Sequence, residues 1–420
     1  MKKNIIILVV VILLSILCPR LLYSQNGIWE TKKSLGLPRA VLSTVEVNGI
    51  IYAIGGSFSG NSSSSAVEAY DTVTGNWSNT KSMPTALVGS GTCVYNDSIY
   101  VFGGAINGEQ GTAVDSVYEY FPSTDTWAKK SSLPMALFST VALTVNNKIY
   151  VIGGAPTGYD YGYNSVYEYD PLLDTWSTKS NMQVGRYGHS AAVVDGIIYI
   201  FGGAKDNSGL AITSVEAYNP ATDTWTARTS MLANLGLTAC SAVNGKIYIF
   251  GGGYSAGSAV NYVYEYDPVL DNWQRKTNMP TARWGAGACT VGGNIYVIGG
   301  ASSSNIRLNT VEEYYPDLDV TDVKKLDDIN GVPTEYNLYQ NYPNPFNPAT
   351  NINFAIPKAS LVVIKVFDLL GREVETLVNE EKAAGSYNIQ FNGSSFSNGI
   401  YFYRMQAGDF TQTNKMILLK

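Results

Sequence analysis

His189 is the only histidine in this sequence of 420 residues. A single imidazole excludes sites that need two or more histidine ligands, which covers most zinc and copper enzymes. A nucleophilic triad would have to be built on His189 itself. That residue stands in the sequence Gly-Arg-Tyr-Gly-His-Ser at 185–190, where a small-residue strand is predicted to begin. We therefore expect His189 to be a hydrogen-bonded residue that lines the interior of the fold, and we assign no catalytic residue.

The cysteines and the repeated aspartates also favour structural roles. Of the four cysteines, Cys18 lies in the N-terminal segment 1–24, which we expect to be removed. The other three, Cys93, Cys240 and Cys289, are odd in number and widely spaced, so we expect buried free thiols rather than a disulfide framework. The pattern Asp-Pro-x-x-Asp, as in residues 267–271, offers too few acidic oxygens for a calcium shell. Asp and Pro at these positions instead suit a tight turn. We predict no metal and no cofactor.

Three arginines, Arg39, Arg186 and Arg283, each lie sixteen residues before a Gly-Gly pair. If these positions surround one channel mouth, the guanidinium groups could gather an anionic ligand. The alternative is that they form ion pairs between neighbouring repeats.

Aromatic residues gather in some of the segments that follow the Gly-Gly pairs. Large rings in loops suit the recognition of sugars or protein surfaces, because they bind with little loss of side-chain entropy. The candidate ligand-binding aromatics are Tyr159, Tyr161, Tyr163 and Tyr254 in these segments, and Trp284 beside Arg283.

These candidate residues belong to a unit that recurs six times. Two markers keep a common step of 48 to 50 residues, and two independent markers in phase over six periods indicate a true repeat. The first marker is Gly-Gly at 55, 103, 153, 202, 251 and 299, and the second is Trp at 29, 77, 127, 176, 225 and 273. Each period contains four predicted strands, the first two joined by a turn such as Asn48-Gly49 that suits a type I′ hairpin.

A four-stranded unit of about 50 residues is typical of a propeller blade. The Gly-Gly pair, the tyrosine before the Asp-Pro turn and the spaced tryptophan resemble the kelch repeat. We predict an all-β, six-bladed kelch-type β-propeller over residues 25–316. Because Trp29 precedes the first Gly-Gly pair and the last repeat has no tryptophan, the N-terminal strand should complete the final blade.

The N-terminus and the net charge bound the cellular context. Residues 1–24 combine two lysines, an apolar run from 5 to 17 and Ser24, and are interpreted as a secretory signal peptide. The mature chain has no predicted transmembrane segment. The formal net charge is −6 and no basic run exceeds two residues, so nucleic-acid binding is not expected.

The C-terminal part has a different composition. A polar linker is predicted at 317–335, and about seven short strands over 336–420 suggest a small immunoglobulin-like β-sandwich. The sequence Asn-Tyr-Pro-Asn-Pro-Phe-Asn-Pro-Ala-Thr at 341–350, with the segments 366–374, 399–401 and 415–420, resembles the C-terminal sorting domain of type IX (Por) secretion cargo. The resemblance implies Sec export, passage through the periplasm, contact with the type IX machinery, and release or display at the outer surface of a Gram-negative bacterium. It also implies cleavage in or near the linker.

The sequence therefore favours a secreted or surface-displayed propeller that binds protein or glycan without catalysis. One alternative is a metal-independent carbohydrate enzyme resembling the sialate (N-acetylneuraminate) epimerases, in which an arginine would meet a carboxylate in one pocket. The other is a structural surface-layer protein.

Overall fold

The computed structural model describes residues 27–59, 62–156, 161–206, 208–254, 258–316, 333, 335–341, 344 and 346–419. These residues form two compact units, divided between residues 319 and 320. The predicted signal peptide at 1–24 and nearly all of the predicted linker at 317–335 lie outside the described residues. The domain boundaries expected from the sequence stay predictions.

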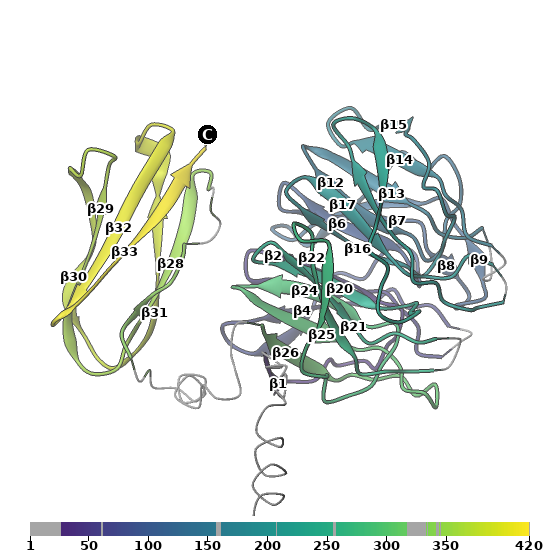
Figure 1. Cartoon of the computed structure of the whole chain (residues 1–420), viewed down its shortest axis with the longest axis horizontal. Helices are drawn as coiled ribbons and strands as arrows, with labels where there is room; N and C mark the ends of the chain where they lie inside the picture. The colour runs from purple at the N-terminus through teal and green to yellow at the C-terminus, as the bar shows by residue number, and fades with distance from the viewer. Residues whose placement is uncertain are drawn as a thin grey trace, which may run out of the picture. The chain divides into compact units, whose positions relative to one another are not determined.

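Within the described residues, the first unit contains six four-stranded antiparallel sheets, which are the blades of a propeller (Figure 1). Blade one consists of β2 (Ser43–Val47), β3 (Ile50–Ile54), β4 (Val67–Asp71) and β5 (Asn76–Asn79). Blade two consists of β6 (Gly91–Tyr95), β7 (Ser98–Phe102), β10 (Val117–Phe121) and β11 (Thr126–Lys130). Blade three consists of β12 (Val141–Val145), β13 (Lys148–Ile152), β14 (Val166–Asp170) and β15 (Thr175–Thr178). Blade four consists of β16 (Ser190–Val194), β17 (Ile197–Phe201), β18 (Val215–Asn219) and β19 (Thr224–Arg228). Blade five consists of β20 (Ala239–Val243), β21 (Lys246–Phe250), β22 (Val263–Asp267) and β23 (Asn272–Arg275).

The sixth blade is completed by the N-terminal strand, as the sequence predicted. Its strands β24 (Gly287–Val291), β25 (Asn294–Ile298) and β26 (Val311–Tyr315) are followed in the sheet by β1 (Ile28–Lys32). Trp29 pairs with Tyr314 in this antiparallel register. The ring is thereby closed by hydrogen bonds between distant parts of the chain, and β26 is paired on both of its sides.

The second strand of each blade is a continuous apolar run because both of its faces are covered by neighbouring blades. In β7, for example, Ile99 and Val101 are fully buried, and Tyr100 and Phe102 are no more than 2% exposed. The first two strands are joined by two-residue turns with positive φ, as at Asn146 and Asn147 (49° and 61°). Asn tolerates this conformation, so the sequence supports the hairpin locally.

Neighbouring blades are joined by a recurring pair of hydrogen bonds. Trp127 Nε1 donates to the Lys81 carbonyl at 2.9 Å, and the Lys81 N–H donates to Asp125 Oδ1 at 2.7 Å. Asp125 Oδ1 also accepts from the Tyr120 hydroxyl at 2.7 Å. Blades three to five repeat this arrangement, with the aspartates Asp174, Asp223 and Asp271. The oxygens of these aspartates thus hold turns and blade junctions, as the turn interpretation of the Asp-Pro-x-x-Asp pattern expected.

The second unit is a β-sandwich, with seven strands in its described residues. One sheet has the order β27 (Asn337–Leu338), β28 (Ala349–Ile356), β31 (Gly385–Asn392). The other has the order β30 (Glu373–Lys382), β29 (Ser360–Phe367), β32 (Gly399–Ala407), β33 (Phe410–Leu418). The inward-facing residues of both sheets form one core that includes Phe354, Ile364 and Tyr403. Short elements elsewhere are β8 (Ala105–Ile106), β9 (Thr112–Ala113) and the 3-10 turn η1 (Gly393–Ser395).

Candidate binding surface

The three candidate arginines are buried inside separate blades. Arg39 and Arg186 are fully buried and Arg283 is 1% exposed. Each one forms an ion pair with a glutamate of the third strand of its own blade; the pairs are Arg39–Glu68 at 2.8 Å, Arg186–Glu216 at 2.6 Å and Arg283–Glu312 at 2.7 Å. The expected pairing between neighbouring repeats is therefore wrong, because the partner lies within the same blade.

Each of these guanidinium groups also fixes the Gly-Gly segment of its blade. Arg39 Nη1 donates to the Gly55 carbonyl at 2.7 Å, and Arg283 Nη1 donates to the Gly299 carbonyl at 3.1 Å. Burial lowers the pKa of Arg39, while the Glu68 charge opposes this shift. The structure does not bring the three arginines together in one pocket, and a buried, paired guanidinium is not available to a solute at the channel mouth.

The sequence carries a signal for these pairs. Where the position sixteen residues before Gly-Gly is Arg, the third strand begins Val-Glu (67–68, 215–216 and 311–312). Where that position is Leu, the third strand begins Val-Tyr (117–118, 166–167 and 263–264). Comparing the repeats with one another would thus have located the partner of each arginine.

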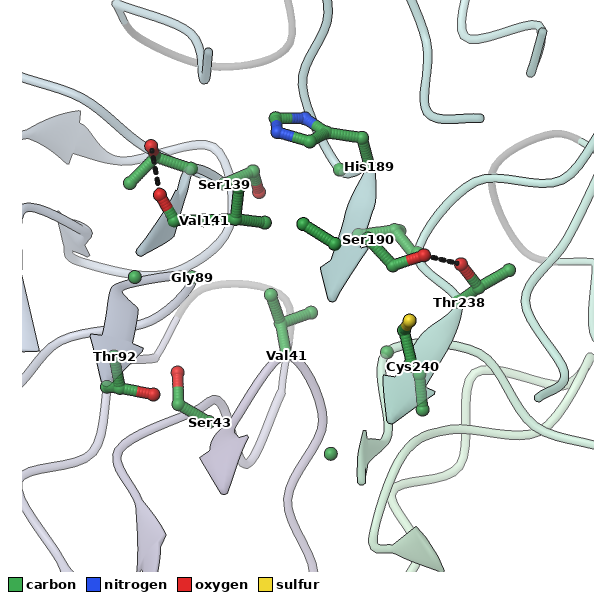
Figure 2. A pocket seen from close by; sticks show the side chains of 18 of the residues that line it. Val41, Ser43, Gly89, Thr92, Ser139, Val141, His189, Ser190, Thr238 and Cys240 are labelled. Atoms are coloured by element: carbon green, nitrogen blue, oxygen red, sulfur yellow. Dashed lines mark hydrogen bonds between the residues drawn. The ribbon is translucent and has the colours of Figure 1, made fainter. Parts of the chain in front are cut away.

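The six innermost strands surround a cavity of about 190 Å³ on the propeller axis (Figure 2). Its lining is small and weakly polar, with Ser43, Thr92, Ser190, Thr238 and Cys240 among the residues drawn. Small-molecule sites usually measure about 300–1,000 Å³. The channel is therefore a narrow space rather than a typical substrate pocket.

A closed ring of backbone hydrogen bonds encircles this channel. In each blade, a residue just before the first strand donates its N–H to the carbonyl of the corresponding residue in the preceding blade, at 2.7–3.1 Å. These six residues have φ between 52° and 65°; they are Val41, Gly89, Ser139, Gly188, Leu237 and Gly285. The ring joins all six blades at one level.

His189 lies at the boundary between blades four and three. Its side chain is 6% exposed, and a Cβ placed on Gly153 of blade three would be 2.7 Å from its Cε1 atom. Burial, assisted by the Arg186 charge, lowers the pKa of His189 to about 3. The adjacent Ser190 hydroxyl is hydrogen-bonded to Thr238 at 2.8 Å (Figure 2). These contacts give His189 a packing role and do not assemble a Ser-His pair.

The cysteines of the propeller are buried or half-buried and free. Burial raises the pKa of Cys93 to about 12, and it also raises the pKa of Cys240 and Cys289. Thiols that stay protonated at neutral pH are poor nucleophiles.

We call the loops that join the second and third strands of the blades the crown. Its described parts are residues 55–59 and 62–66, 103–116, 153–156 and 161–165, 202–206 and 208–214, 251–254 and 258–262, and 299–310. Because the strands of a blade alternate in direction, these loops share one face of the propeller with the connections between blades.

Hydrogen bonds join crown loops of neighbouring blades. Gly162 N–H donates to the Lys205 carbonyl at 2.9 Å, and Ala211 N–H donates to the Tyr254 carbonyl at 3.2 Å. The Gly108 N–H donates to Ser63 Oγ at 2.9 Å. A crown held by such bonds forms a semi-rigid surface rather than a set of independent loops.

A buried ion pair also spans the crown. Arg307 of blade six pairs with Glu109 of blade two, and the Ser57 hydroxyl of blade one donates to the same carboxylate. Arg307 lies over the Trp284 ring, with 5.3 Å from its guanidinium carbon to the ring centroid. Burial raises the pKa of Glu109, while Ser57 and the Arg307 charge oppose this shift. Sequence reasoning missed this cluster because its members lie in loops that do not repeat.

Large apolar side chains are exposed on the crown of five blades. Their exposed fractions range from 36% to 63%, and they are Phe58, Tyr161, Leu210, Tyr254 and Ile306. Of the predicted aromatics, Tyr161 and Tyr254 thus lie at the surface. Tyr163 is half-buried, with its ring edge-to-face to Tyr161 at 5.3 Å and its pKa raised to about 12 by the Tyr161 hydroxyl. Trp284 is buried, and Tyr159 lies outside the described residues.

Comparisons with known proteins agree with this architecture. Residues 41–234 and 188–336 match the family model described as the KLHDC2/KLHL20/DRC7 Kelch-repeats domain. A solved structure titled "Structure of YjhT" matches with a TM-score of 0.60 at 16% identity, covering 67% of this chain and 95% of that chain. At this identity the likeness shows the fold alone. No curated protein matches the chain.

Residues 340–419 match the model described as the secretion system C-terminal sorting domain of the Por type. The match confirms the predicted sorting domain and indicates secretion or cell-surface display in a Gram-negative bacterium. Among the described residues, no helix is long and apolar enough to cross a membrane.

Proposed function

The chain belongs to the kelch-repeat family and carries a secretion sorting domain, and from this premise we propose that its propeller is a non-catalytic binding module whose crown holds a protein or glycan partner. The observation that carries the proposal is the set of exposed large apolar side chains on five crown loops, from Phe58 to Ile306. Exposed apolar side chains on several loops of one face favour an interaction site on a secreted protein.

The form of the crown favours an extended partner over a small molecule. Leu210 is 59% exposed and Ile306 is 63% exposed, and these aliphatic side chains offer contact area without hydrogen-bonding groups. Tyr161 and Tyr254 add aromatic rings with hydroxyl groups, which suit both protein surfaces and sugar rings. The hydrogen bonds between crown loops limit the entropy lost on binding.

The arrangement gives less support to a carbohydrate enzyme of the epimerase type. That reading requires Arg39, Arg186 or Arg283 to meet a carboxylate in a pocket open to substrate. Each arginine instead meets its glutamate in the interior, with side-chain exposures of 0% for arginine and at most 4% for glutamate. Neither the narrow channel nor the protonated thiols supply the acid–base pair that such an enzyme needs.

Site-specific photocrosslinking of the full-length secreted chain on host cells tests the proposal. A photoreactive residue at position 210, on the crown, should capture a cell-surface component. The same residue at position 172, which is 77% exposed on the opposite face, is the matched control. A glycan array with wild type and Tyr161→Ala then separates the partner classes, because a sugar ligand should lose signal in the variant. Equal crosslinking from both positions, or from neither, would contradict a crown-specific site.

A further inference from the structure

Several residues of the most distinctive motif of the sorting domain, the segment 341–350, are internal to the sandwich. Asn341 is 2% exposed; its backbone N–H donates to the Tyr403 hydroxyl at 2.7 Å, and its side chain donates to Thr350 Oγ1 at 2.9 Å. Phe346 is also 2% exposed; its N–H donates to the carbonyl of Ile417 in β33, and its carbonyl accepts from the N–H of Leu419, just after β33. Asn341 and Phe346 thus hold the fold together and offer almost no surface to a partner, whereas Asn347 and Pro348 of the same motif are exposed.

Another motif of the same domain is displayed to solvent. The turn at 368–372 joins β29 to β30 and places two consecutive leucines at its tip, with Leu369 65% exposed and Leu370 77% exposed. At these exposures the two leucines bury little apolar surface within the domain. Leu361, in β29, is 53% exposed but has no exposed large apolar neighbour in sequence.

The turn that carries these leucines is fixed by Asp368. Its Oδ1 atom accepts hydrogen bonds from the Leu370 N–H at 2.9 Å and the Arg372 N–H at 3.0 Å. Its Oδ2 atom accepts from Arg372 Nε at 2.7 Å, and the Gly371 N–H donates to the Asp368 carbonyl at 3.0 Å. The two leucines are therefore presented in a preorganised conformation, which lowers the entropy lost on docking.

We propose that the tip formed by Leu369 and Leu370 docks into an apolar pocket of the type IX secretion machinery and marks the chain for export. The secretion machinery is inferred as the partner from the family match, because a secretion system must contact the domain of residues 340–419. Asn341 and Phe346 of the 341–350 motif are buried and cannot make that contact. The preorganised leucine pair is the surface of this domain that best fits an apolar pocket.

Export of the full-length chain in a type IX-competent host tests this inference. We expect the double variant Leu369→Ser/Leu370→Ser to reduce extracellular protein by about tenfold or more, because two leucines would no longer be buried at the contact. Leu361→Ser, an exposed leucine of the same domain, is the matched control and should be exported like wild type. Normal export of the double variant, or an equal loss in the control, would overturn the proposal.

A second measurement keeps the test independent of folding. A photoreactive residue at position 370, with the rest of the chain unchanged, should crosslink to a component of the secretion machinery, whereas one at position 361 should not. Absence of a machinery crosslink from position 370 would overturn the docking role. Neither measurement involves a propeller ligand, so their outcome is separate from that of the binding function.

Discussion

Arg283 and Glu312 form an ion pair inside blade six, with Arg283 Nη2 2.7 Å from Glu312 Oε2 and both side chains at most 1% exposed. Glu312 also accepts a hydrogen bond from the Thr281 hydroxyl at 2.6 Å. Blade two carries the same local sequence, Met-Pro-Thr-Ala, followed by Leu87 instead of arginine. There the Thr85 hydroxyl bonds to the hydroxyl of Tyr118, which replaces the glutamate. The same position in the two blades is thus filled either by an arginine with a glutamate or by a leucine with a tyrosine.

This relationship predicts a strong non-additivity. Arg283→Leu alone should destabilise the propeller by about 3–5 kcal/mol, because it leaves Glu312 buried without its charge partner. The double variant Arg283→Leu/Glu312→Tyr reproduces the arrangement of blade two and should recover most of that loss. Urea unfolding of the two single variants and the double variant measures the coupling. Additive changes in the free energy of unfolding would show that the two side chains are not energetically coupled.

The junction between blades six and one lacks the aspartate that is found at four other junctions. Gly75 stands where four other blades have an aspartate with φ of 51–54°, and its own φ is 66°. Trp77 Nε1 already donates to the Lys33 carbonyl at 2.8 Å, as in those blades. Gly75→Asp should therefore stabilise the protein by about 1 kcal/mol by accepting hydrogen bonds from the Lys33 N–H and the Tyr70 hydroxyl. In thermal unfolding, Gly75→Ala is the control and should destabilise; a gain with alanine would contradict the explanation.

The position of Gly89 in the backbone ring around the channel predicts that Gly89→Ala lowers the stability of the protein. This residue has φ of 65°, and an added Cβ would lie 2.5 Å from Phe138 Cε2. Gly89→Ala should cost about 1–2 kcal/mol or more, through left-handed backbone strain and this contact. Ser139 occupies the same ring position with φ of 52°, so Ser139→Gly should change stability by less than about 0.5 kcal/mol. Denaturant unfolding of both variants checks the contrast, and equal effects would refute it.

His189 makes the stability of the protein depend on pH. Its pKa is about 3 in the folded protein and about 6.5 when unfolded, so below pH 6.5 the unfolded chain binds an extra proton. The unfolding free energy should fall as the pH is lowered from 6.5 to 4.5, by up to about 1.4 kcal/mol per pH unit. His189→Thr, the residue found at this position in blades three and five, should remove the slope whatever its effect at neutral pH. An unchanged slope would assign the dependence to other groups.

The fold could be predicted because its signals repeat. Trp29 before the first Gly-Gly pair, and no tryptophan after the last, already implied that the N-terminal strand completes blade six. The arginines were harder, because the spacing of Arg39 gives its place on a face but not the direction of its side chain. Its partner Glu68 lies 29 residues away and becomes evident only when blades with arginine are compared with blades with leucine.

The crown could not be predicted in the same way. Arg307 and Glu109 are separated by 198 residues and lie in loops that differ between blades, so no pattern indicates their contact. Leu210 and Ile306 were not singled out, because an isolated aliphatic residue in a loop carries no sequence signal of exposure. Tyr161 and Tyr254 were found because tyrosine in a Gly-rich loop is conspicuous.

The crown is proposed as the face by which the secreted propeller binds its partner. Binding of purified full-length chain to host cells tests it most directly, with the crown variant Leu210→Ser/Ile306→Ser compared with Leu172→Ser/Leu173→Ser on the opposite face. All four leucine and isoleucine side chains are 59–77% exposed, so neither variant should alter folding. We expect the crown variant to bind at least about tenfold more weakly and the control to bind like wild type. Unchanged binding of the crown variant, with or without loss in the control, would contradict the account.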